Sequence, residues 1–151
     1  MPQDQATLLR LIAMDADDLS VISANLQDAR VSVSEMAYLP EQRRFAFAGK
    51  RFDWLKAAAG GCERCATGLH FERVLGVSRT GFAQDEAQRV LNLLAIEFEP
   101  KDAPGGTVVL TFSGGAAIQL QVECVEAQMR DLGERWPCDN QPAHPVDVED
   151  A

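Results

Sequence analysis

Residues 107–122 read TVVLTFSGGAAIQLQV, and this stretch indicates the kind of fold that the chain adopts. Thr107–Phe112 is a run of apolar and β-branched residues, which favour strands. Ser113-Gly114-Gly115 follows, and glycines accept the positive φ angles that tight hairpin turns require. In the next segment Ile118, Leu120 and Val122 alternate with polar residues, as on a half-buried strand. The stretch therefore predicts two antiparallel strands joined by a tight turn.

The same signals recur toward the N-terminus and predict a meander of strands. The apolar or alternating segments are Leu8–Met14, Val31–Leu39, Arg43–Trp54, Leu69–Ser78 and Arg89–Glu99. Pro40 presets φ for the turn that joins the second and third of these into a hairpin. Leu91–Ile96 is nearly continuous apolar, which is typical of a strand covered on both faces. A helix over Asp85–Leu94 is the competing interpretation, and Leu55–Thr67 is expected to be an exposed loop, with a frayed helical turn in Ala57-Ala58-Ala59 as an option.

Two segments carry helical spacing, one near each end of the chain. Leu19, Ile22 and Leu26 share one helical face, so we expect a helix over residues 17–28 with Asp15 as its N-cap. Near the C-terminus, Val125, Met129 and Leu132 are spaced in the same way. Gly133 suits the position just after a helix end. A C-terminal helix is therefore predicted there.

Together these segments predict an α+β fold. The expected architecture is an antiparallel strand meander curled into a sheet or partly open barrel, with one N-terminal helix and one C-terminal helix. A pleckstrin-homology-like roll is one way to build it. Residues 1–136 are expected to form a single domain, and residues 137–151, with three prolines and four acidic residues, an acidic flexible tail.

The charge of the chain argues against polyanionic partners. Among 151 residues, 23 are Asp or Glu and 14 are Lys or Arg, giving a net charge of −9. Nucleic acids and anionic membrane surfaces attract clustered basic residues, so neither is an expected partner. Met1–Arg10 lacks a basic segment followed by an apolar one, so we expect the cytoplasm. The four cysteines, Cys62, Cys65, Cys124 and Cys138, are then expected to be reduced thiols.

Several short motifs resemble a bacterial family of unknown function, DUF2948, which is associated with alphaproteobacteria. They include Leu11-Ile12-Ala13-Met14-Asp15, Ala37-Tyr38-Leu39-Pro40, Arg51-Phe52-Asp53-Trp54, Phe98-Glu99-Pro100, Leu110-Thr111-Phe112 and Asp131-Leu132-Gly133. The resemblance covers nearly the whole chain, up to Pro142-Ala143-His144. It supports a single domain and implies no catalytic residue.

Cys62-x-x-Cys65 is the first candidate site. A structural zinc site needs four ligands, and the chain has no second such pair. A redox pair is usually found in a βαβ context with the motif at a helix start. The main interpretation is that Cys62 and Cys65 are two thiols in a polar loop without a special role. The alternative is a metal or redox role for this pair.

A basic hairpin is the second candidate site. Arg43, Arg44, Lys50 and Arg51 lie close together in an otherwise acidic chain, and Asp53 follows on the same strand face as Arg51. One interpretation is a solvated strand face with ion pairs of little energetic weight. The other is a small-anion or carboxylate site, because arginine forks match such groups. Arg73, in an apolar segment, would join this site or pair with Asp53 or Glu72.

No known catalytic motif stands out from the sequence. The chain has two histidines and lacks a Gly-x-Ser-x-Gly elbow, a glycine-rich phosphate loop and an HExxH motif. We therefore expect a non-enzymatic binding or protein-interaction module without a cofactor. A protein partner is expected, and exposed strand edges are compatible with a homodimer. The alternatives are a small enzyme or anion-binding protein at the basic hairpin, and a metal or redox role for Cys62 and Cys65.

Overall fold

The computed structural model describes residues 8–138, which form ten strands and two α-helices. The strands are β1 (Arg10–Ala13), β2 (Arg30–Ser32), β3 (Met36–Leu39), β4 (Arg44–Phe52), β5 (Glu63–Phe71), β6 (Val74–Thr80), β7 (Val90–Pro100), β8 (Gly106–Phe112), β9 (Ala117–Val122) and β10 (Ala127–Pro137). The helices are α1 (Ala16–Leu26) and α2 (Trp54–Ala58). The predicted α+β fold of mostly antiparallel strands is thus confirmed, whereas the strands do not follow one another in the sheet as in a meander.

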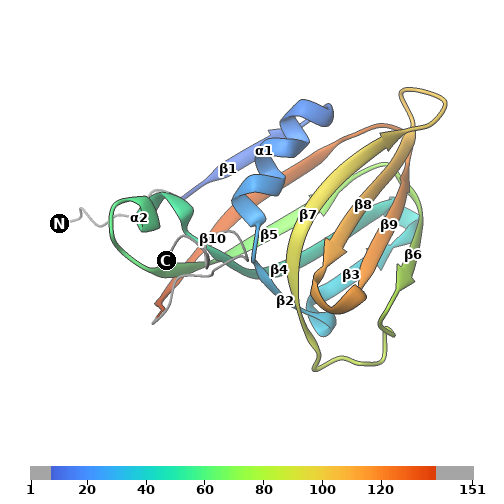
Figure 1. The fold of residues 1–151 in the computed structure, drawn as a ribbon. Coiled ribbons are helices and arrows are strands. Elements are labelled where there is room, and N and C mark those ends of the chain that lie inside the picture. The colour runs from blue at the N-terminus through green and yellow to red at the C-terminus, as the bar shows by residue number, and fades with distance from the viewer. Residues whose placement is uncertain (1–7, 139–151) are drawn as a thin grey trace.

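All ten strands belong to one antiparallel sheet. Its order is β1-β10-β5-β4-β2-β7-β8-β9-β6, and β3 pairs with the first half of β4. The half made of β7, β8, β9 and β6 curves round toward β3 and β4 (Figure 1). The backbone N–H of Val74 at the start of β6 donates to the carbonyl of Arg43 just before β4, at 2.9 Å. The sheet remains open, with β1 and β6 at the two ends of the strand order.

The hydrophobic core fills the inside of this curled sheet, and α1 covers one side of it. Phe45, Phe71 and Phe112 are almost completely buried there. Helix α1 contributes Leu19, Ile22 and Leu26, as the helical spacing predicts. Its N-cap is Asp15, whose Oδ1 accepts from the Asp18 N–H at 2.8 Å. Capping by such a side chain typically contributes about 1 kcal/mol.

The predicted C-terminal helix is wrong, because residues 127–137 form β10. This strand pairs with β1 on one edge and β5 on the other. Val125 and Met129 are four residues apart, a spacing that fits a helical face and also an alternating strand face. The pairing partners decide between the two, and they come from distant parts of the sequence. A pleckstrin-homology-like roll with a terminal helix therefore does not describe residues 8–138.

The region predicted as an exposed loop over Leu55–Thr67 is also different in the structure. Helix α2 occupies the alanine-rich part, and β5 begins at Glu63 with Cys65, Ala66 and Thr67 buried. The single strand predicted over Leu69–Ser78 is two strands, β5 and β6, with a turn at Glu72 and Arg73. Strands β4 and β10 cover both edges of β5, which explains why polar residues lie in a buried strand.

Residues 90–100 form a strand, so the helix considered over Asp85–Leu94 is wrong. Leu91, Leu93 and Ile96 of β7 are buried, whereas Val90 is 54% and Leu94 38% exposed. The strand is thus buried on one face rather than covered on both. No helix in the part of the chain that the structure describes is long and apolar enough to cross a membrane.

The C-terminal end of the described chain is held by β10. Pro137, expected to begin the tail, is the last residue of that strand, and the Cys138 N–H donates to the Cys62 carbonyl at 3.1 Å. The remainder of the predicted tail, residues 139–151, lies outside the described residues.

Candidate functional site

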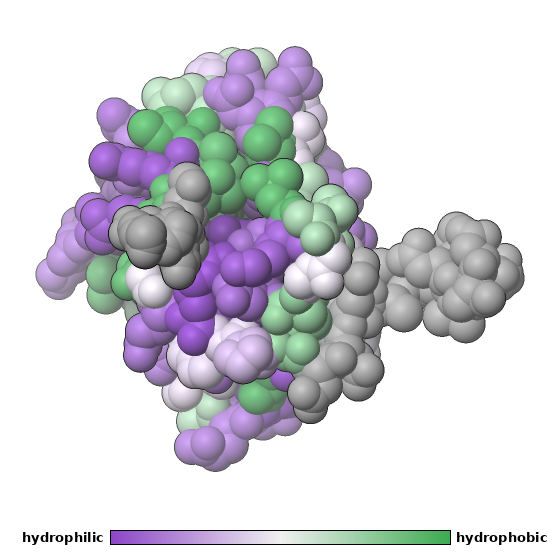
Figure 2. Space-filling view, turned by 90° about the vertical axis from the view of Figure 1, so that its left-hand side faces the viewer, coloured by the Kyte–Doolittle hydropathy of each residue, from purple (hydrophilic) through white to green (hydrophobic). Residues whose placement is uncertain are grey.

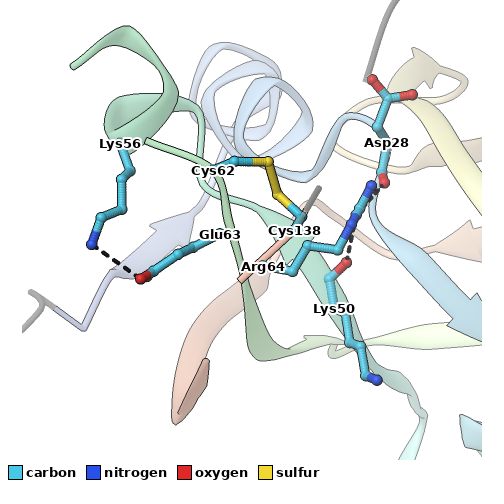
Figure 3. Close-up of a disulfide and its surroundings, with 7 residues drawn as sticks. All are labelled: Asp28, Lys50, Lys56, Cys62, Glu63, Arg64 and Cys138. Atoms are coloured by element: carbon cyan, nitrogen blue, oxygen red, sulfur yellow. Dashed lines mark hydrogen bonds and ion pairs between the residues drawn. A yellow bond between two sulfur atoms is a disulfide. The ribbon is translucent and has the colours of Figure 1, made fainter. Parts of the chain in front are cut away.

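A disulfide joins the loop after α2 to the end of β10 (Figure 3). It links Cys62 to Cys138, whose Cα atoms are 5.3 Å apart and which are 76 positions apart in sequence. The prediction that all four cysteines are reduced thiols is therefore wrong for these two, because the fold places them side by side. Cys65 and Cys124 are free thiols.

Cys62 and Cys65 do not act as a pair in this structure. Cys62 is bonded to Cys138, whereas Cys65 points into the buried side of β5. Burial, followed by the nearby Asp131 carboxylate, raises the pKa of the Cys65 thiol, which makes it a poor nucleophile at neutral pH. Within residues 8–138, no group of three or more His, Cys, Asp or Glu side chains could hold a metal ion.

A buried network of charges lies on the core side of β4, β5 and β10 near the disulfide. Arg51 donates from Nε and Nη2 to the two Asp131 oxygens, both at 2.8 Å. Arg135 pairs with Asp53 and also with Glu63, the latter at 2.8 Å. Lys56 adds a second cation to Glu63 at 3.2 Å (Figure 3). The surface at this end of the molecule also has hydrophilic residues at its centre (Figure 2).

The carboxylate of Asp131 is stabilised in its charged form. Burial alone disfavours the charge, but hydrogen bonds from Arg51 and the Leu9 N–H and the Arg51 charge outweigh it and lower the pKa of Asp131. The Leu9 N–H donates to Asp131 Oδ2 at 2.8 Å. Arg51 and Asp131 are therefore a structural pair that holds β4 and β10 in register across β5.

The other residues of the predicted basic site have separate intramolecular partners. Arg43 pairs with Glu123 at 3.3 Å and Arg44 with Glu72 at 2.8 Å. Arg73 lies in the β5–β6 turn rather than in a strand, and pairs with Glu126 at 3.2 Å instead of Asp53 or Glu72.

The five predicted site residues do not gather in one place. Arg44 and Arg51 are seven residues apart along β4, which corresponds to roughly 23 Å on a strand. Arg51 pairs with Asp131 and Asp53 with Arg135, so the predicted Arg51–Asp53 pair is replaced by two pairs to β10. None of the five lines the concave surface described next. A shared ligand site for them stays a prediction.

A groove opens on the outer face of the sheet, across the middle strands. Its volume is about 690 Å³. It is lined by Arg30, Ser32, Glu35, Ala48, Gly49, Lys50, Ala66, Val90, Asn92, Leu132, Glu134 and Trp136, and we refer to it as the groove. The floor is hollow because β4 and β5 present small side chains there, Ala48 and Ala66. Larger side chains from β2, β7 and β10 form the walls.

Two cations face each other in the groove. Arg30 of β2 and Lys50 of β4 are directly opposite in the antiparallel register, so their side chains project from the same face. Like charges in this position destabilise a sheet. Glu35 and Glu134 also line the groove, yet neither forms an ion pair with Arg30 or Lys50 among the described residues. Within residues 8–138, neither cation thus has a carboxylate at ion-pair distance.

Arg64 adds a third positive charge beneath this pair. Its Nη1 donates to the Asp28 carbonyl at 2.9 Å and to the Lys50 carbonyl at 3.3 Å (Figure 3). Burial lowers the pKa of Arg64, and the charge of Arg30 lowers it further, while Asp28 raises it. Arg64 thus adds a buried positive charge beside Arg30, and Asp28 partly offsets it.

The rest of the groove offers apolar surface. The Lys50 ammonium lies 4.3 Å from the centre of the Trp136 ring, a cation–π contact. Val90 is 54% and Leu132 51% exposed, and both line the groove. A ligand that carries both a carboxylate and an apolar side chain would match this surface.

The sequence prediction found one member of this cluster. Lys50 belongs to the predicted basic hairpin, but Arg30 and Trp136 were not among the candidates. Arg30 begins β2 and Trp136 lies near the end of β10, so only the strand order brings them to Lys50. An arginine at the start of a short strand carries no local signal of this role.

The fold and the groove define an open antiparallel-sheet protein with a partly apolar cleft in which two cations face each other. Comparison with curated proteins and with solved structures gives no match. A family model described as "Protein of unknown function (DUF2948)" matches residues 9–144. The chain therefore belongs to the DUF2948 family, as its motifs indicate.

Proposed function

We propose that this protein is a non-enzymatic binding module whose groove takes an acidic peptide segment of a partner protein. The observation that carries the proposal is the cross-strand pair of Arg30 and Lys50, which has no anionic partner at ion-pair distance in residues 8–138. Such a pair costs folding free energy, and a bound carboxylate would relieve that cost.

The walls of the groove support a peptide rather than a small inorganic anion. Trp136, Val90 and Leu132 offer apolar contact beside the cations. Aromatic and aliphatic side chains next to a charged group are typical of protein-recognition surfaces. The net charge of −9 repels long polyanions, whereas a short acidic segment meets the local positive field.

The proposal is tested with two labelled nine-residue peptides in a Gly/Ser background. One carries a single glutamate with a leucine two positions later, and its twin carries glutamine instead. Fluorescence anisotropy should show the glutamate peptide binding about tenfold or more tightly, since a charge-assisted hydrogen bond contributes about 1.5–3 kcal/mol. NMR titration should shift the Trp136 indole signal. Equal affinity of the twins would overturn the proposal.

Two double variants with the same change in net charge locate the site. Arg30→Gln with Lys50→Gln should abolish the preference for glutamate, whereas Arg43→Gln with Arg73→Gln should keep it. The second variant removes two exposed cations of the predicted basic hairpin, outside the groove. If it alone loses the preference, the small-anion site at the basic hairpin is favoured instead.

The predicted cytoplasmic location is tested by the redox state of Cys62 and Cys138. Structural disulfides persist in oxidising compartments and are rare in the cytosol. Thiol trapping in native cells should find this pair reduced if the protein is cytoplasmic. An oxidised pair would contradict that location.

A further inference from the structure

A second hollow lies beside the groove on the same outer face of the sheet. Its volume is about 340 Å³, and its lining includes Arg10, Gln128 and Arg130 above a floor of Ala46 and Gly68. Leu132 lines both hollows, so they adjoin along β10.

This hollow contains another pair of facing cations. Arg10 of β1 and Arg130 of β10 are directly opposite in the antiparallel register. Gln128 accepts from Arg10 Nε at 3.0 Å and from Nη2 at 3.2 Å when its amide oxygen is turned toward Arg10. Neither arginine forms an ion pair within the described part of the chain. Two like-charged cross-strand pairs therefore occur on one face of a protein whose net charge is −9.

The strand register gives the spacing of the two pairs. Arg130 lies opposite Gly68, which lies opposite Ala48, and Ala48 is two residues before Lys50 on β4. Two steps of about 3.4 Å along the strands and two spacings of about 4.8 Å across them place the Cα atoms of Arg130 and Lys50 roughly 12 Å apart.

An extended peptide can bridge this distance with a specific spacing. Positions i and i+4 of an extended chain project to the same side and are separated by about 13 Å. Position i+2 would then lie over the small side chains of Ala48 and Ala66, and beside Leu132.

We infer that Arg10 and Arg130 form a second carboxylate subsite, so that the outer face selects peptides with acidic residues at i and i+4 and an apolar residue at i+2. The inference rests on the proposed function, because it extends the same groove. Arg130 gives the second carboxylate a forked donor, which is the geometry that arginine offers to carboxylates, and Arg10 Nη1, which Gln128 does not use, adds a further donor.

The test adds a second glutamate to the single-glutamate peptide, four residues from the first, with leucine between them. We expect the doubly acidic peptide to bind about tenfold or more tightly than the single one. A gain from the local positive field alone would not depend on the position of the second glutamate. A peptide with the second glutamate at i+3 should show no gain, since that side chain projects to the other side.

Arg10→Gln with Arg130→Gln should remove the gain and leave binding of the single-glutamate peptide within about twofold. Arg43→Gln with Arg73→Gln, with the same change in charge, should keep the gain. In wild-type protein the second glutamate should also shift the amide signals of Gly68 and Ala48. These signals report the subsite independently of the variants.

The outcomes separate the two proposals. Suppose that the single-glutamate peptide binds at the groove. If the i+4 glutamate then gives no gain in affinity, or gives the same gain in the Arg10/Arg130 variant, the second subsite is wrong and the proposed binding at the groove is unaffected. If neither peptide prefers glutamate over glutamine, the proposed function fails and the subsite with it.

Discussion

Arg51 and Asp131 lie 80 residues apart in the sequence and form a two-point ion pair inside the protein, with both N–O distances at 2.8 Å. The Asp131 side chain is fully buried and that of Arg51 is 5% exposed. Since β5 lies between their strands, the pair bridges β4 and β10 on the core face.

Replacing Asp131 with alanine should destabilise the fold strongly. The change leaves the Arg51 charge buried and unpaired, which typically costs about 3–5 kcal/mol. Urea denaturation measures the free energy of unfolding. Glu123→Ala, which breaks the exposed pair with Arg43, is the matched control and should cost about 0–1 kcal/mol. Equal losses in the two variants would contradict a structural role for the buried pair.

Stability should fall in acid because three carboxylates, those of Glu63, Glu86 and Asp131, have lowered pKa values in the folded state. For Glu63 the main cause is the hydrogen bond from Arg135; for Asp131, burial opposes the shift but Arg51 and Leu9 outweigh it. A depressed folded pKa contributes stability above the unfolded pKa of about 4, and this is lost as pH falls further. The free energy of unfolding should be steady above about pH 5 and decline below it. A pH-independent value, or a rise in acid, would refute this.

Breaking the disulfide should weaken the fold without changing its architecture. Cys62→Ser removes a link that closes a loop of 76 positions, and loops of this size typically lose about 2–4 kcal/mol. The control is Cys124→Ser, which removes a free thiol that is only partly buried. Urea curves of both variants, with and without reductant, check the prediction. Only the wild type and Cys124→Ser should respond to reductant.

The two free thiols should react at very different rates. Cys65 is completely buried and burial raises its pKa, whereas Cys124 is partly exposed. Alkylation by iodoacetamide at neutral pH, followed by mass spectrometry, should label Cys124 first. Cys65 should react only when urea unfolds the protein, and labelling of both at one rate would show that β5 opens readily.

Substituting Lys50 with glutamate should have opposite effects on binding of the acidic peptide and on the stability of the fold, the latter compared with glutamine at the same position. Lys50→Glu and Lys50→Gln both lose the cation–π contact with Trp136, but only the glutamate turns the like-charged cross-strand pair with Arg30 into an opposite-charged one. Lys50→Glu should therefore be more stable than Lys50→Gln by about 0.2–1 kcal/mol. Both changes should abolish binding of the acidic peptide. Urea denaturation and anisotropy measure the two effects. Lower stability of Lys50→Glu than of Lys50→Gln would show that a negative charge opposite Arg30 is not favoured in the free protein.

Local patterns were sufficient for much of the fold. The N-cap and spacing of residues 15–26 predict α1, and the glycine turn at 113–115 with its flanking runs predicts β8 and β9. These elements form where neighbouring residues alone set the backbone preference. For the segment around Met129, neighbouring residues alone do not decide the backbone conformation, because the spacing of its apolar residues fits both a helix and a strand.

Candidate site residues were harder to predict than strands. Arg43, Arg44 and Arg51, which are near one another in the sequence, suggested a site together with Arg73, yet each of the four has its own carboxylate partner in the fold. The groove instead joins Arg30, Lys50 and Trp136, which are separated by long stretches of chain. Proximity in sequence does not predict proximity across a sheet whose strand order differs from chain order.

The sequence by itself determined the family, the antiparallel strands, the first helix and the acidic charge, because these depend on composition and on the preferences of neighbouring residues. Only the tertiary structure decided that residues 127–137 are a strand, that Cys62 bonds to Cys138, and that Arg30 faces Lys50. Each of these depends on which strands pair, and strand pairing is fixed by burial of the whole core rather than by any local segment.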